Sequence, residues 1–136
     1  SDDKEVAYVW STEHLYAGCP DLIGEIGGVK VIADFKTSNA PYMSSFPDKG
    51  DRIGFGGFRK YQKCAQQMAA YRLALEERTG YKCDVALIIV STPETTQGIF
   101  IDGDQMDLYE SRFLKRAEQF HMLFPPDENE VKISSQ

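Results

Sequence analysis

The chain has 136 residues, the size of one domain, and its 42% hydrophobic and 12% aromatic residues exclude an intrinsically disordered protein. Its net charge of −6 excludes a protein that holds nucleic acid mainly by bulk positive charge. No run approaches the ~18–20 apolar residues of a membrane span, and no signal peptide is visible at the start. We therefore expect no membrane partner.

Three widely spaced cysteines, Cys19, Cys64 and Cys83, form no C-x-x-C pair. Neither a zinc ribbon nor an iron–sulfur cluster is indicated. Unpatterned cysteines suit a reducing compartment, so we expect an intracellular protein, in the cytoplasm or in a host cell if the chain is phage-encoded.

The first half of the chain predicts strands and a long loop. Residues 5–10 alternate between apolar and polar side chains, which is typical of a strand. Residues 15–26 and 29–36 predict two more strands, joined at Gly27-Gly28 by a two-residue hairpin turn. Residues 39–57 are rich in proline and glycine and predict a loop long enough to be functional.

The second half predicts two helices around two strands. Residues 58–78 carry an apolar stripe of helical spacing, which ends at Gly80 as a C-cap. Residues 83–91 form a continuous apolar run, typical of a strand buried on both faces, and 98–101 form a shorter strand. A last helix is expected from Asp104, its N-cap, to the Pro125-Pro126 pair.

These elements predict an α/β fold in which helices flank a mixed central sheet. The helix between the third and fourth strands permits a crossover, so we expect those two strands to be parallel.

The hairpin pattern predicts a register as well as a turn. If Gly27-Gly28 forms the loop, Glu25 lies opposite Lys30 and Asp21 lies opposite Asp34. Since side chains alternate along a strand, each face has a fixed composition. The predicted core face carries Leu22, Ile26, Val29, Val31, Ala33 and Phe35. The opposite face carries Asp21, Ile23, Glu25, Lys30, Ile32, Asp34 and Lys36.

The two aspartates of that polar face raise a chemical question, because like charges directly opposite each other destabilise a sheet. A divalent cation would turn the repulsion into attraction, and carboxylates suit Mg²⁺ or Mn²⁺. Lys36 points the same way as Asp34 and can stabilise negative charge on a phosphate. These are the parts for hydrolysing a phosphodiester, although a solvated hairpin face with incidental charges is the simpler alternative.

A family resemblance rests on the same residues. Gly18-x-x-Asp21, twelve residues and then Asp34-Phe35-Lys36-Thr37-Ser38, followed by Gln67-x-x-x-Tyr71, resembles the PD-(D/E)XK nuclease superfamily. Within it the chain looks most like the RecB-type branch, and in particular like mitochondrial genome maintenance exonucleases and related phage enzymes. The resemblance covers roughly residues 13–122. It implies a restriction-endonuclease-like core.

The resemblance also implies roles for individual residues. Asp21 and Asp34 would ligate Mg²⁺, for which Mn²⁺ can substitute, together with the backbone carbonyl of Phe35. Lys36 would be the catalytic lysine. Many relatives carry a further acid or a histidine in a helix before the first strand, and we expect the single nuclease domain spanning 1–136 to lack that helical part. Glu13 is the nearest acid that could replace it as a metal ligand, although a solvated glutamate is the simpler interpretation.

The predicted helix offers residues that could contact DNA. Gln67 and Tyr71 share one helix face, and the resemblance implies that they position active-site groups and the DNA strand. Lys63 lies one turn earlier on that face and Lys60 is nearby, so both are candidates for phosphate contacts. The remaining candidates for substrate binding are Thr37 and Ser38, at the end of the hairpin motif.

The aromatic residues of the long loop have two interpretations. Tyr42, Phe46, Phe55 and Phe58 could stack unpaired bases beside a nuclease site, or the loop could pack onto its own domain.

Together these features predict a metal-dependent DNA nuclease, with exonuclease action on single-stranded DNA or free DNA ends as the first choice. The alternatives are an endonuclease of the same superfamily, a non-catalytic nucleic-acid-binding module with this fold, and an enzyme acting on another phosphate ester. The sequence leaves open whether the protein forms a homo-oligomer or part of a larger nuclease complex.

Overall fold

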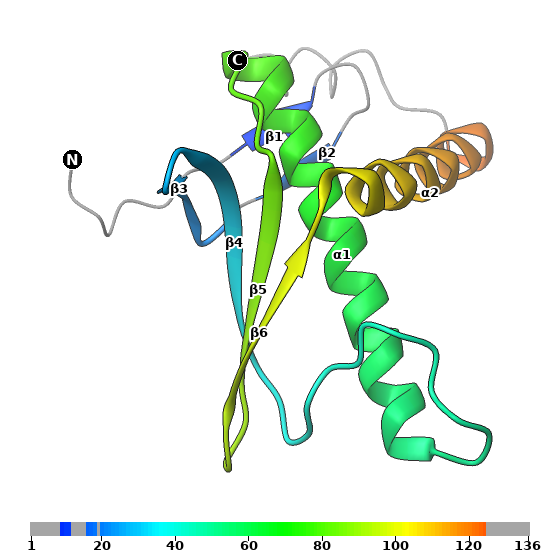
Figure 1. The fold of residues 1–136 in the computed structure, drawn as a ribbon. Coiled ribbons are helices and arrows are strands. Elements are labelled where there is room, and N and C mark those ends of the chain that lie inside the picture. Colours follow the sequence, from blue (N-terminus) through cyan, green and yellow to red (C-terminus); the bar gives the residue numbers. More distant parts are fainter. Residues whose placement is uncertain (1–8, 12–15, 19, 125–136) are drawn as a thin grey trace.

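The computed structural model describes residues 9–11, 16–18 and 20–124. Figure 1 shows the arrangement of the helices and strands. In chain order the elements are β1 (Val9–Ser11), β2 (Tyr16–Gly18), β3 (Leu22–Ile26), β4 (Val29–Thr37), α1 (Arg52–Thr79), β5 (Val85–Ser91), β6 (Thr96–Ile101) and α2 (Gly103–Leu123). Of the strand predicted at residues 5–10, positions 5–8 lie outside the described residues.

The main sheet has the strand order β3-β4-β5-β6. β4 and β5 are parallel, whereas β3 with β4 and β5 with β6 are antiparallel. α1 connects the two parallel strands, as predicted from the crossover. The prediction of a mixed sheet flanked by helices is therefore confirmed.

The strand predicted at residues 15–26 is divided in the structure. Residues 16–18 form β2, which pairs with β1 in a separate two-stranded sheet, and the strand of the main sheet begins at Leu22. The prediction of one continuous strand was wrong because an apolar run does not show where a chain changes its pairing partner. As a result, Asp21 precedes β3.

The hairpin turn and its register agree with the prediction. Gly27 and Gly28 have φ values of 59° and 83°, the positive values that a two-residue turn of this kind requires. Glu25 pairs with Lys30, and the ladder continues as far as Leu22 opposite Ala33.

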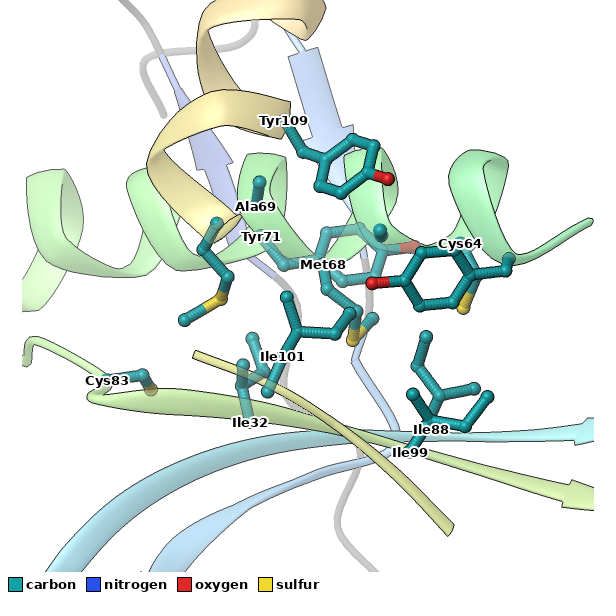
Figure 2. Close-up of a cluster of buried hydrophobic side chains, with 14 of the residues drawn as sticks. Ile32, Cys64, Met68, Ala69, Tyr71, Cys83, Ile88, Ile99, Ile101 and Tyr109 are labelled. Carbon is teal, nitrogen blue, oxygen red and sulfur yellow. The ribbon is translucent and has the colours of Figure 1, made fainter. Parts of the chain in front are cut away.

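The face of the hairpin that meets the core is the opposite of the predicted one. The buried cluster takes Ile32 from β4, with Ile88 from β5 and Ile101 from β6. α1 covers this face, and Figure 2 shows Met68 of α1 between the helix and the sheet. α2 contributes Met106 and Tyr109 to the same cluster.

The face predicted to be the core is only partly covered. Leu22, Ile26, Val29 and Phe35 are between 40% and 60% exposed. Their neighbours Val31 and Ala33 on that face are buried. Both faces carry apolar residues, so counting them could not decide the question. The covered face is the one that α1 crosses, and it is also the face of Asp34 and Lys36.

β5 shows the same one-sided burial. Its residues alternate between buried and half-buried side chains, rather than being buried on both faces as predicted. The buried members, Ala86, Ile88 and Val90, belong to the cluster beneath α1.

α1 begins at Arg52, six residues earlier than predicted, and the predicted loop is correspondingly shorter. Glycines in the first turns suggested a loop, but they allow close packing here. A Cβ on Gly57 would lie 2.6 Å from the backbone oxygen of Pro41, so only glycine lets the loop pack this tightly on the helix. Asp51 caps the helix by accepting a hydrogen bond from the N–H of Gly54 at 2.8 Å.

The remaining helix ends follow simple capping chemistry. Gly80 ends α1 in the left-handed conformation with φ 76°, as predicted. Asp102, not Asp104, caps α2, and its Oδ1 accepts a hydrogen bond from the N–H of Gln105 at 2.8 Å. In the part of the chain that the structure describes, neither helix has the length and apolar character needed to cross a membrane.

Candidate active site

Asp34 and Lys36 lie at the end of β4, on the face that α1 covers. Side chains two residues apart in a strand point the same way, so Ile32, Asp34 and Lys36 form one row. Ile32 is fully buried and Asp34 is 5% exposed, so the row passes from the apolar core to a charged end. A buried carboxylate at the edge of a core needs a partner to offset its desolvation.

Asp21, the residue just before β3, is held against this row. Its Oδ2 accepts a hydrogen bond from the backbone N–H of Phe35 at 2.7 Å. A hydrogen bond also links the side chains of Asp21 and Asp34. The structure thus brings together the two predicted aspartates, although the strand ladder ends one residue short of them.

The backbone of Phe35 adds a further oxygen. In a strand the N–H and C=O of one residue point to the same edge, so the Phe35 carbonyl lies on the side of Asp21. The Phe35 side chain lies on the opposite face of the sheet and is 53% exposed.

Lys36 forms an ion pair with Asp34, with Nζ 2.9 Å from Oδ2. That buried oxygen accepts no well-directed hydrogen bond. Lys36 Nζ also donates to Oε1 of Gln67 on α1 at 3.3 Å. The ammonium group is therefore fixed between the sheet and the helix.

The two carboxyl groups have different proton affinities because their surroundings differ. Burial, together with the hydrogen bond to Asp21, raises the pKa of Asp34 to about 6. The hydrogen bond from Asp34 outweighs burial and lowers the pKa of Asp21. For Lys36 burial favours the neutral amine, but the Asp34 carboxylate outweighs it and the pKa is raised. The site thus pairs an ionised and a readily protonated carboxyl group beside a fixed cation.

This donor set fits a small divalent cation. It offers two carboxylates and one carbonyl, which are the hard oxygen ligands that Mg²⁺ prefers, and Mg²⁺ usually keeps several of its waters. The buried Asp34 oxygen without a directed donor is an acceptor that such an ion would satisfy. Within residues 9–11, 16–18 and 20–124 no group of three or more His, Cys, Asp or Glu side chains is gathered in one place. Glu13, predicted as a further ligand, lies outside the described residues.

The predicted substrate-binding residues separate into two groups. Gln67 is exposed and touches Lys36, and Lys60 Nζ donates to Ser38 Oγ at 3.2 Å. Tyr71, by contrast, is 9% exposed and belongs to the buried cluster of Figure 2. Its ring is therefore not presented at the surface to a DNA strand. Lys63 on α1 and Thr37 at the end of β4 are both exposed.

The loop aromatics are also divided. Tyr42 is 7% exposed, and both its N–H and its carbonyl bond to the side chain of Gln97, so this part of the loop packs on its own domain. Phe46 remains 74% exposed, in edge-to-face contact with Phe55 and Phe58.

Cys64 is a neighbour of the site that the sequence did not single out. It is buried on α1, and burial raises the pKa of its thiol to about 12, so it stays neutral. Its thiol interacts electrostatically with Lys36, Asp34 and Asp21. Its position three residues before Gln67 was the available signal, since that spacing puts both near one stretch of the helix.

Comparison with known proteins adds little to this geometry. No family model matches this chain. No curated protein matches it either. The crystal structure of SSO0001 aligns with 82% of this chain at a TM-score of 0.45 and 17% identity. The aligned part is 42% of that chain, so the present chain spans well under half of its length. A likeness of this degree carries no argument about function.

Proposed function

We propose that the protein is a divalent-metal-dependent DNA nuclease with a restriction-endonuclease-like core. One observation carries the proposal. The buried Asp34 oxygen that lacks a directed hydrogen bond lies 2.9 Å from the Lys36 ammonium, beside the carboxylate of Asp21. Two carboxylates that can hold a cation, with a lysine beside them that can stabilise negative charge, form a site that can support phosphodiester hydrolysis.

Asp21, Asp34 and the Phe35 carbonyl would hold the cation, with Mg²⁺ as the natural ion and Mn²⁺ as a substitute. When bound, the cation would supply Lewis-acid stabilisation of charge on the phosphate and a nucleophile at neutral pH. The backbone N–H of Phe35 would keep Asp21 in place, since it already donates to that carboxylate at 2.7 Å.

Lys36 would stabilise the negative charge that develops on the phosphate. Its ammonium is shared between Asp34 at 2.9 Å and Gln67 at 3.3 Å, so its position is set before substrate arrives. A preorganised cation is worth more in catalysis than a mobile one because it does not need to reorganise in the transition state. Gln67 acts as the positioning residue for this lysine.

DNA is the proposed substrate because the motif resembles RecB-type nucleases, and exonuclease action at single strands or free ends is the first choice. We also propose that the protein is intracellular and that it assembles as a homo-oligomer or in a larger nuclease complex. The endonuclease alternative differs in one respect, since an endonuclease also cuts circles.

The test is hydrolysis of end-labelled DNA, linear and circular, single- and double-stranded, with Mg²⁺. Wild type should degrade linear substrates and leave closed circles intact. Lys36→Ala should be at least ~100-fold slower, because it removes the preorganised charge. The matched control is Lys115→Ala, which removes an exposed lysine from α2. Equal rates for wild type and Lys36→Ala would reject the nuclease proposal, and cleavage of circles would reject the exonuclease choice.

A further inference from the structure

A second lysine joins the same two elements as the active-site lysine. Lys36 of β4 reaches Gln67 of α1 at 3.3 Å, and Lys60 of α1 reaches Ser38, the residue after β4, at 3.2 Å. Each contact runs between the end of β4 and α1. The backbone of Ser38 is fixed as well, because its N–H donates to the carbonyl of Ser91 at 2.9 Å.

The two contacts follow one line along the site. Lys60 and Gln67 are seven residues apart, which is two helical turns, so they share a face and lie ~10 Å apart along the axis. Lys36 and Ser38 are two residues apart, ~7 Å along the strand direction. The two contacts are therefore separated by roughly 7–10 Å along the site, which is of the order of the separation of neighbouring phosphates in an extended DNA strand.

Lys60 is better suited than Lys36 to bind an anion. Lys36 is paired with Asp34, whereas Lys60 forms no ion pair with a carboxylate of any residue that the structure describes. Its side chain is exposed, and Ser38 takes one of its three N–H donors. The neutral hydroxyl thus holds the ammonium in place without cancelling its charge.

From this arrangement we propose that Lys60 and Ser38 bind the phosphate next to the scissile one on the same strand. This inference rests on the proposed function, and it names the substrate class: an oligonucleotide strand with at least one phosphate beyond the reacting one. A phosphate bound at this distance positions the strand and carries no base specificity. A substrate with a single phosphodiester would not reach this second position.

The activity test compares two substrates. One is a short oligothymidylate, and the other is the p-nitrophenyl ester of thymidine monophosphate, which has one phosphodiester only. Lys60→Ala should lower kcat/KM on the oligonucleotide by about tenfold, the loss expected for a hydrogen bond to a charged group. It should leave kcat/KM on the ester unchanged. Lys60→Arg should recover most of the loss, and Lys115→Ala should behave as wild type on both substrates.

A binding measurement tests the inference without catalysis. In an Asp34→Asn background, the affinity for a labelled oligothymidylate is measured over a range of salt concentrations. Adding Lys60→Ala should reduce the slope of log affinity against log salt by about one phosphate contact. Adding Lys115→Ala should not change the slope.

The outcomes separate the two proposals. An equal loss on both substrates, or no loss on either together with an unchanged salt slope, overturns the second phosphate position and makes the contact of Lys60 with Ser38 a structural tie. If wild type hydrolyses neither substrate, the nuclease proposal fails, and the salt slope alone then supports or overturns the phosphate position.

Discussion

The carboxylate of Asp21 accepts a hydrogen bond from the backbone N–H of Phe35 at 2.7 Å, at the point where the ladder between β3 and β4 ends. This single contact replaces the next rung of the ladder with a side chain. It places Asp21 beside Asp34, and it leaves the Phe35 carbonyl facing the same edge. The pair of carboxylates is therefore a consequence of where the strand pairing stops.

Removing the charge of Asp34 should change how stability depends on pH. Its pKa is raised from 3.8 to about 6, so between these values the folded protein binds more protons than the unfolded chain. The stability that comes from proton binding by Asp34 is therefore present at low pH and is lost as the pH rises through about 6. Without metal at about pH 8, Asp34→Asn should stabilise the protein by on the order of 1 kcal/mol, and at about pH 4 it should have little effect. Denaturant unfolding at both pH values measures this.

Mg²⁺ should reverse the order of stability of wild type and Asp34→Asn, so that wild type becomes the more stable protein. A cation that binds only the folded site raises the melting temperature, and the rise grows with the logarithm of the cation concentration once this exceeds Kd. Wild type should gain stability with Mg²⁺ at neutral pH, and Asp34→Asn should not. Asp48→Asn, which removes an exposed loop carboxylate, is the control and should respond as wild type does. An equal shift for all three proteins would mean that Mg²⁺ binds elsewhere.

Gln67 should matter through Lys36 alone. Gln67→Leu removes the acceptor that lies 3.3 Å from the lysine ammonium, and we expect kcat to fall by about tenfold with KM little changed. In the Lys36→Ala background the same substitution should have no further effect, because residues that act as a unit are not additive. Steady-state kinetics of both single variants and the double variant decides this, and additive losses would show that Gln67 contacts the substrate directly.

The start of α1 can be tested with two neighbouring glycines. Gly57→Ala would place a Cβ 2.6 Å from the Pro41 oxygen and should destabilise the protein by ~1–3 kcal/mol. Gly56→Ala meets nothing within 4 Å and should stabilise it by up to ~1 kcal/mol, the difference in helix propensity. Chemical denaturation compares them. If instead Gly57→Ala stabilised the protein and Gly56→Ala destabilised it by a similar amount, residues 52–57 would not be helical.

Arg72 should hold α2 against α1. Its side chain is 6% exposed and lies 2.7 Å from Asp107 and 3.1 Å from Glu110 of α2. Arg72→Met should cost ~1–3 kcal/mol, less than for a fully buried pair because Asp107 is 70% exposed. The exposed Arg116→Met should change stability by less than ~0.5 kcal/mol. Thermal unfolding measures both, and equal losses would mean that the Arg72 ion pairs do not hold α2 against α1.

For the hairpin, the sequence predicted some features correctly and others wrongly. Gly27-Gly28 predicted the turn and the register correctly. Glycine readily adopts the positive φ that this kind of hairpin turn requires, and both glycines have it in the structure. The buried face was predicted wrongly, because Ile32 and Phe35 are equally apolar and the choice between their faces depends on where α1 crosses the sheet. That crossing is a tertiary contact with no local signal.

The site was more predictable than the fold around it. Asp21, Asp34 and Lys36 could be placed together from register and alternation alone, and the structure brings them together. Tyr71 could not be placed this way, because a position one turn from Gln67 can face either solvent or the core. The contact of Lys60 with Ser38 depends on how α1 lies over the end of β4, which no spacing in the sequence specifies.

We propose that Asp21 and Asp34 hold a cation that supports DNA hydrolysis. The most direct test of this proposal is the initial rate on linear DNA as a function of Mg²⁺ concentration. Wild type and Asp48→Asn should show the same saturable rate and none in excess EDTA. Asp21→Asn and Asp34→Asn should each lose at least ~100-fold at any Mg²⁺ concentration. Hydrolysis by wild type in EDTA, or undiminished rates in both aspartate variants, would contradict the account.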